Sequence, residues 1–128
     1  MDIPMENSQN NKTMVIMLLD GPYISQYVNI GFEMAEAALN LGYGVKIFLY
    51  MDGVHNLQKD QKPRDFQNIS QLFQSLIEKG CEIKACIRCA VSRGYHDQSQ
   101  FLDGVEIASV YDLAEWMLGD SKVITLGG

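Results

Sequence analysis

Short apolar runs alternate with segments of helical periodicity along almost the whole of this chain. The two longest runs, residues 14–19 and 45–51, are continuously apolar or nearly so, as in strands buried on both faces. Shorter segments at 82–85, 104–107 and 122–126 complete a set of five predicted strands. Between them, apolar residues recur every three or four positions, and glycines stand where helices commonly end. Strict alternation of strand and helix predicts a parallel sheet with helices on both faces.

The predicted fold class is therefore α/β, a three-layer α/β/α domain with a mostly parallel five-stranded sheet. The chain has 128 residues, which is enough for one domain that buries a core without disulfides or a metal. Residues 1–12 are polar and lack the apolar centre of a secretory signal. We therefore predict a disordered N-terminal tail over residues 1–12 and a single domain over residues 13–128. No apolar run is long enough to span a bilayer, so we expect no membrane segment.

The net charge and the number of cysteines exclude some functions for this chain. Ten Lys and Arg stand against sixteen Asp and Glu, which gives a net charge of -6. A protein that binds phosphate backbones needs a concentrated basic face, so we expect no direct binding of nucleic acid. The three cysteines form an odd set, clustered in one stretch of the chain, and make a poor disulfide framework. Free thiols suit a reducing compartment, so a cytoplasmic location is predicted.

The ends of the predicted strands indicate where the chemistry lies. In open parallel sheets, ligands gather at the carboxyl ends of the strands. Three segments occupy such ends: residues 21–23, residues 52–56 and the segment that starts at Cys86. We therefore expect side chains from these segments to meet at one edge of the sheet.

Cys86 is the strongest candidate for a reacting group. It lies at the join between the third predicted strand and the helix that follows. The partial positive charge at the start of a helix favours a thiolate, and Arg88 and Arg93 add positive charge nearby. A thiolate is the nucleophilic form of cysteine, so this position suits attack on a sulfur donor and retention of an anionic persulfide.

Other interpretations of the cysteines remain open. Cysteine often fills buried space, which favours a structural role for Cys81 and leaves the role of Cys89 undecided. The Cys86-x-x-Cys89 spacing also permits a reversible disulfide. Zinc would need two further ligands beside this pair, and the two histidines are isolated in the sequence, so we predict no metal. The chain has no glycine-rich phosphate-binding loop, and we predict no cofactor.

Three motifs occur in a fixed order along the predicted domain. Residues 21–23, Gly-Pro-Tyr, follow the first strand and precede an alanine-rich helix. Residues 50–56 read YMDGVHN, and Cys86 is followed by a helix that closes in Arg-Gly at residues 93–94. In this order and spacing, the motifs resemble the DsrE/TusD family of sulfur-relay proteins.

The resemblance implies a flavodoxin-like, DsrE-like fold and a persulfide carried on Cys86. It also implies a cytoplasmic homo- or hetero-oligomer, such as a trimer or hexamer, that exchanges sulfur with donor and acceptor proteins. Some members of the family lack the active cysteine and serve only as partner subunits. This chain departs from TusD in carrying Cys89, and it has His55 where tyrosine is usual.

We therefore predict a sulfur-relay protein that accepts and passes on sulfur as a persulfide on Cys86. Two alternatives stay open: a non-catalytic subunit for oligomeric assembly or binding, and a dithiol redox protein. The predicted site comprises two reacting thiols, two arginines that stabilise the anion and three pocket residues: Cys86, Cys89, Arg88, Arg93, Tyr23, His55 and Asn56.

Overall fold

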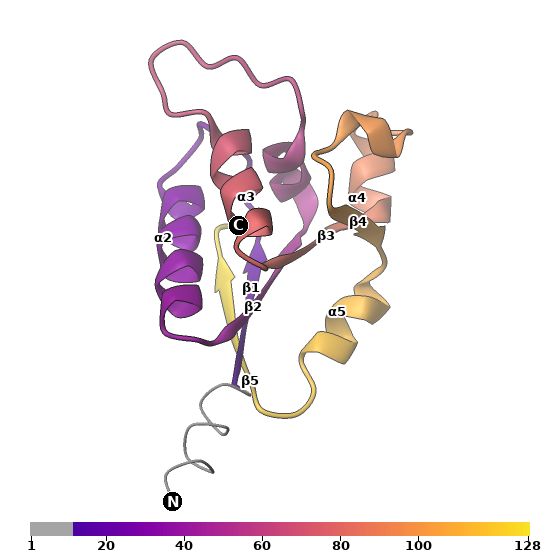
Figure 1. Cartoon of the computed structure of the whole chain (residues 1–128). Helices are drawn as coiled ribbons and strands as arrows, with labels where there is room; N and C mark the ends of the chain where they lie inside the picture. The colour runs from indigo at the N-terminus through magenta and orange to yellow at the C-terminus, as the bar shows by residue number, and fades with distance from the viewer. Residues whose placement is uncertain (1–11) are drawn as a thin grey trace, which may run out of the picture.

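The computed structural model describes residues 12–128, in which five strands form one sheet (Figure 1). The strands run in the spatial order β4-β3-β2-β1-β5, and every neighbouring pair is parallel. Their bounds are β1 Thr13–Leu18, β2 Gly44–Leu49, β3 Glu82–Cys86, β4 Val105–Ala108 and β5 Ser121–Leu126. The predicted five-stranded α/β fold is confirmed, and the sheet is parallel throughout. The predicted tail over residues 1–12 falls, apart from Lys12, outside the described residues.

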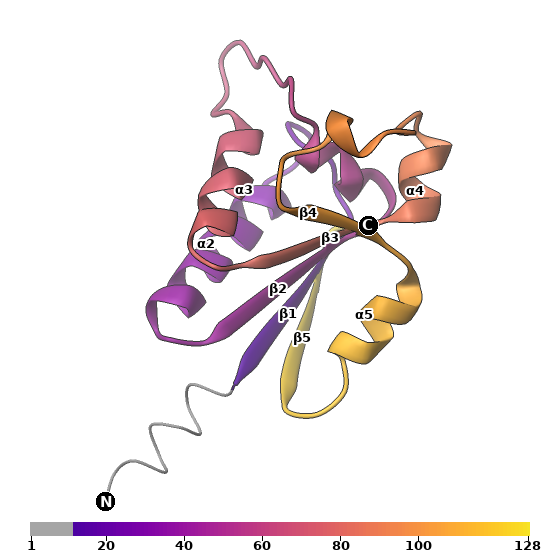
Figure 2. The same cartoon turned by 45° about the vertical axis from the view of Figure 1, so that its right-hand side comes forward.

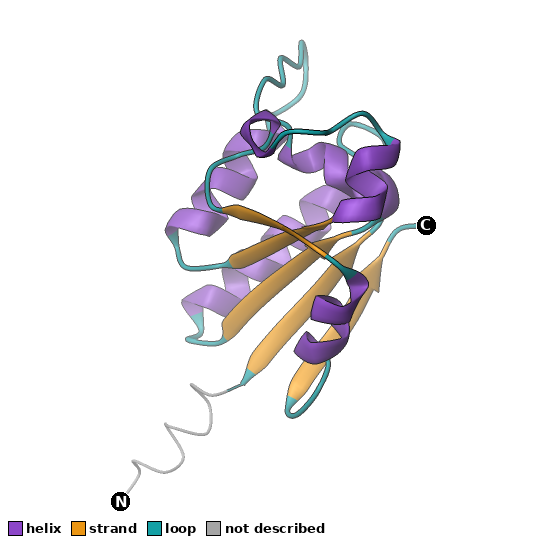
Figure 3. Ribbon diagram, turned by 90° about the vertical axis from the view of Figure 1, so that its right-hand side faces the viewer, coloured by secondary structure: helices purple, strands orange, loops and turns teal. Residues whose placement is uncertain are grey.

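Helices cover both faces of the sheet, as Figures 2 and 3 show. Their bounds are α2 Tyr27–Asn40, α3 Ile69–Glu78, α4 Ile87–Ser92 and α5 Val110–Trp116, with 3-10 helices η1 Met51–Leu57 and η2 Gln98–Gln100. From β1 to β4 the chain moves in one direction across the sheet, and β5 then returns to lie beside β1. Because such crossovers are right-handed, this reversal puts α5 on the face opposite α2 and α3. No helix within residues 12–128 has the length and apolar character needed to cross a membrane.

Aromatic and cationic contacts hold α5 against its face of the sheet. Trp116 packs edge-on against Phe48 of β2, with 6.2 Å between ring centroids. The Nζ atoms of Lys46 and Lys84 lie 5.5 and 5.0 Å from the centre of the Trp116 ring. Lys84 Nζ is also 3.7 Å from the carboxylate of Asp112, in the first turn of α5. Both lysine charges therefore face the Trp116 ring, and the buried Lys84 also meets an acid.

The segment after β2 differs from the prediction. The sequence predicts a strand to residue 51 and then a polar loop, whereas β2 ends at Leu49 and η1 follows at once. Met51 has a left-handed backbone with φ of 52°, which ends the extended conformation. Gly53 packs so closely on β1 that a Cβ there would lie 2.2 Å from Leu18 O. A contact between distant segments therefore decides the conformation of this stretch.

Candidate functional site

Cys86 occupies the junction predicted from the sequence. It is the last residue of β3 and the N-cap of α4, and its Sγ accepts the N–H of Cys89 at 3.5 Å. The residue is only 2% exposed, yet it borders a pocket of about 220 Å³ between the starts of α4 and α5. The pocket is lined by Cys86, Ile87, Arg88, Ser109, Val110 and Tyr111. A small reactant or the tip of a peptide segment fits a space of this size.

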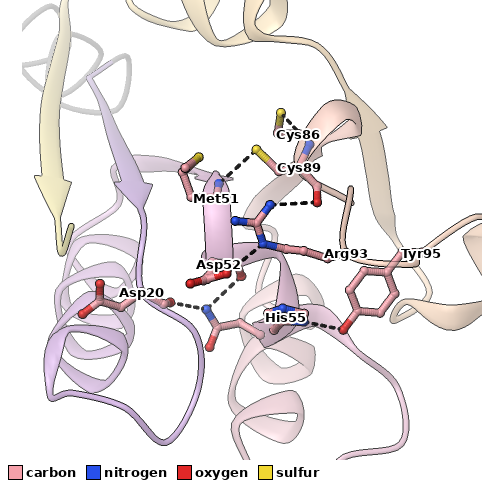
Figure 4. Close-up of polar contacts among 10 residues, drawn as sticks. Asp20, Met51, Asp52, His55, Cys86, Cys89, Arg93 and Tyr95 are labelled. Carbon is pink, nitrogen blue, oxygen red and sulfur yellow. Dashed lines mark hydrogen bonds and ion pairs between the residues drawn. The ribbon is translucent and has the colours of Figure 1, made fainter. Parts of the chain in front are cut away.

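Cys89 lies one turn further along α4, beside Cys86 (Figure 4). Its Sγ accepts the backbone N–H of Met51 at 3.1 Å. Burial raises the pKa of the Cys89 thiol, and the neighbouring Cys86 thiol raises that pKa further, against opposing effects of the Met51 N–H and Arg93. Cys89 therefore retains its proton at neutral pH.

The two predicted arginines have different surroundings. Arg88 is exposed and lines the Cys86 pocket. Arg93 donates through Nε to Asp52 Oδ1 at 2.7 Å and through Nη1 to the carbonyl oxygen of Cys89 at 3.1 Å (Figure 4). Arg93 thus links the end of α4 to η1, while Arg88 is the arginine that borders the Cys86 pocket.

The three predicted pocket residues lie around the neighbouring strand ends. His55 Nδ1 is 2.7 Å from the hydroxyl of Tyr95 (Figure 4). His55 and Tyr23 border a second pocket, of about 460 Å³, formed by the loop after β1 and residues 58–63. The structure therefore groups Tyr23 with His55 around one pocket and Cys86 with Arg88 around another.

Asn56 is fully buried and joins two of the strand-end segments. Its Nδ2 donates to the carbonyl oxygens of Asp20 and Gly53, both at 2.9 Å. Among the described residues, Asn56 Oδ1 has no hydrogen-bond partner. The side chain therefore holds the end of β1 against η1.

Three groups near the thiols were not predicted. The Met51 N–H carries no sequence signal, because a backbone donor is present at almost every position. Asp52 was placed at a strand end, but its pairing with Arg93 joins residues distant in sequence. Lys84 did leave a signal, since it is a charged residue inside a buried strand, two positions before Cys86 and on the same face. It is 8% exposed.

Cys81 has the surroundings of a structural residue. It is buried, and burial raises the pKa of its thiol to about 12. At neutral pH this thiol is protonated and unreactive. Within residues 12–128, no three His, Cys, Asp or Glu side chains converge on a point suited to a metal ion.

Comparison with known proteins identifies the family. Residues 12–126 match the sequence model of the DsrE/DsrF-like family. The chain belongs to this family. Protein YchN of Escherichia coli is 31% identical, over 88% of this chain and 97% of its own length. A protein of Methanopyrus kandleri is 35% identical, over 87% of this chain and 91% of its own length.

Two further comparisons bear on the fold and the chemistry of this DsrE/DsrF-like chain. The crystal structure of the E. coli YchN protein superposes with a TM-score of 0.78 at 30% identity, over 89% of this chain and 98% of that one. A more distant relative, from Allochromatium vinosum, has the name "Putative sulfurtransferase DsrE". It is 28% identical, over 66% of this chain and 68% of its own length.

Proposed function

We propose that this DsrE-family chain is a cytoplasmic sulfur-relay protein that carries sulfane sulfur as a persulfide on Cys86. The observation that carries the proposal is the position of Cys86, at a strand end beside a pocket with Arg88 on its wall. The name of the A. vinosum relative supports the same chemistry. Donor and acceptor proteins would present their thiols at this pocket.

The reaction consists of two exchanges. The Cys86 thiolate attacks the terminal sulfur of a donor persulfide, and the donor leaves as a thiolate. An acceptor thiolate then attacks the terminal sulfur on Cys86, and Cys86 becomes the leaving thiolate. The Cys89 N–H already donates to Cys86 Sγ, and Arg88 supplies a positive charge at the pocket wall. Both can stabilise the negative charge that develops on sulfur during each exchange.

Intact-mass measurement after loading with inorganic polysulfide tests the proposal. We expect the reduced chain to gain one sulfur atom, and Cys86→Ser to gain none. Cys81→Ala is the matched control, because it removes a buried thiol away from the pocket and should load like the wild type. Loading of Cys86→Ser to the wild-type level would refute the assignment.

We also propose that the chain acts as an oligomer of like subunits. The α5 apolar face, defined here as Val110, Tyr111, Met117 and Leu118, supports this. These side chains lie on α5 or just after it, and their exposed fractions run from 40% to 80%. Exposed apolar side chains gathered on one helix are typical of an interface. A chain that forms an oligomer but never gains sulfur would instead be a non-catalytic assembly subunit.

A further inference from the structure

Cys86 and Cys89 form a pair of thiols on the first turn of α4. Side chains three residues apart on a helix lie on one face, and CxxC pairs at helix starts can form disulfides. Here the Cys86 side chain already folds back over this turn, since its Sγ accepts the Cys89 N–H at 3.5 Å. Each thiol also accepts one backbone N–H, Cys86 Sγ from Cys89 and Cys89 Sγ from Met51. The second thiol is therefore placed to react with anything bonded to the first.

A backbone donor from another segment is directed at the second thiol. The Met51 N–H lies 3.1 Å from Cys89 Sγ, across 38 positions of sequence (Figure 4). Met51 reaches this position in a left-handed conformation, which residues other than glycine adopt only rarely. A buried cysteine that only fills space needs no such donor, whereas a thiol that becomes an anion during a reaction is stabilised by one.

Arg93 fixes the distance between that donor and the thiol. It donates to the carbonyl oxygen of Cys89 and to the carboxylate of Asp52, the residue after Met51. The turn that carries Cys89 and the segment that carries Met51 are thereby held together. Two segments distant in sequence, α4 and η1, therefore build the surroundings of Cys89.

Resting on the persulfide proposed for Cys86, we propose that Cys89 discharges it as hydrogen sulfide and forms a Cys86–Cys89 disulfide. The Cys89 sulfur attacks Cys86 Sγ, and the bond between Cys86 Sγ and the terminal sulfur breaks. The terminal sulfur leaves as hydrosulfide and takes up the proton lost by Cys89. The sulfane sulfur gains two electrons and the two cysteine sulfurs lose them, so no other oxidant is needed. A cellular dithiol then reduces the disulfide and restores both thiols.

This step gives the sulfur two outcomes. When an acceptor thiol occupies the pocket, it takes the sulfane sulfur; in its absence, Cys89 releases sulfide and closes the site. Burial raises the pKa of the Cys89 thiol, and a protonated thiol attacks more slowly than a thiolate, so the discharge step is slowed. The two cysteines therefore release, after a delay, any sulfane sulfur that no acceptor thiol has taken.

Loading followed by a chase without acceptor tests the step. Trypsin, which cleaves after Lys and Arg, separates the three cysteines into peptides 80–84, 85–88 and 89–93. Full-length wild type, Cys89→Ser and the control Cys81→Ala are loaded with inorganic polysulfide, desalted and followed by sulfide assay and peptide mass. We expect wild type and Cys81→Ala to release sulfide while peptides 85–88 and 89–93 become linked. Cys89→Ser, whose hydroxyl still accepts the Met51 N–H, should keep its sulfur at least ~10-fold longer.

The possible results distinguish failure of the role proposed for Cys89 from failure of the persulfide proposed for Cys86. Equal rates of discharge in Cys89→Ser and wild type would overturn the role of Cys89. So would loss of sulfur without a disulfide, or transfer of the sulfur to peptide 89–93. Cys89→Ala, checked for folding by circular dichroism, repeats the test without any side-chain oxygen. Absence of sulfur on peptide 85–88 even in Cys89→Ser would refute the persulfide itself, and with it both proposals.

Discussion

Asn56 and Gly53 join the end of β1 to η1 at the level of single atoms. Asn56 Nδ2 satisfies two carbonyl oxygens, one on each segment, inside the core. Gly53 leaves no space for a side chain against Leu18 O. Both contacts bring Met51 and Asp52 to the positions from which they reach α4. The geometry of the thiol pair therefore depends on residues that do not touch it.

Replacement of Asn56 by Asp tests this junction. The variant is nearly isosteric, but it removes the donor and puts a carboxylate against two carbonyl oxygens. We expect a loss of about 3 kcal/mol in the free energy of unfolding, measured with urea. Asn29→Asp, at an exposed position of α2, is the control and should change stability by less than about 0.5 kcal/mol. Equal stability of Asn56→Asp and wild type would contradict the assigned hydrogen bonds.

The buried thiol of Cys81 makes stability depend on alkaline pH. Its pKa is about 12 in the folded chain, against an ordinary 9.0. The folded state therefore binds this proton more tightly than the unfolded state does. The resulting stability is fully present below pH 9.0 and is lost as the pH rises towards 12. We expect Cys81→Ala to lose less stability than wild type across this range, as measured by denaturant midpoints. Parallel curves for the two proteins would count against the assigned burial effect.

At the scale of elements, η1 and α4 meet through the left-handed turn at Met51. The turn directs a backbone N–H, and the Met51 side chain itself is 46% exposed. The contact to Cys89 therefore depends on the conformation of residue 51 and little on its side chain. Substitutions at residue 51 can therefore distinguish the need for a left-handed backbone from the need for a packed side chain.

Met51→Gly and Met51→Val form a matched pair for this element. Glycine adopts the left-handed conformation freely, so Met51→Gly should retain wild-type stability to within about 1 kcal/mol. Valine is β-branched and clashes with the backbone in this conformation. Met51→Val should therefore lose about 1–2 kcal/mol in the free energy of unfolding. Thermal unfolding followed by circular dichroism measures both. If valine were tolerated as well as glycine, the turn would not have the conformation described.

Most of the strands and helices, and the parallel sheet, could be predicted from the sequence. Apolar periodicity indicates five strands alternating with helices, and this strict alternation predicts a parallel sheet. The same reasoning located Cys86 at a strand end. It did not predict η1, because the contact of Gly53 with Leu18 O joins segments that are distant in sequence. For the same reason, the Met51–Cys89 and Arg93–Asp52 contacts required the structure.

At the scale of the whole molecule, net charge and exposed apolar surface are the features that support the proposed protein partners. The charge of -6 disfavours polyanions, and the α5 apolar face offers a surface beside the Cys86 pocket. Val110 and Tyr111 belong to both the face and the pocket wall. An oligomer built on this face would therefore add residues of a neighbouring subunit near the reacting thiol.

Native mass spectrometry of Leu118→Lys tests the oligomer. Leu118 is 74% exposed on the α5 apolar face, and a charge there should dissociate subunits that pack on it. We expect the wild type at a multiple of 14.4 kDa and the variant shifted towards that mass. Leu41→Lys, 62% exposed at the end of α2, is the control and should match the wild type. A wild type that stays monomeric would refute the proposed assembly.

Tryptic mapping of the loaded protein tests the persulfide on Cys86 most directly. Peptides 80–84, 85–88 and 89–93 carry Cys81, Cys86 and Cys89 separately, so the position of an added sulfur is unambiguous. After loading with inorganic polysulfide and rapid alkylation, we expect the extra sulfur on peptide 85–88, and its retention there in Cys89→Ser. Extra sulfur confined to peptide 80–84 or 89–93 would contradict the account, as would its absence from all three.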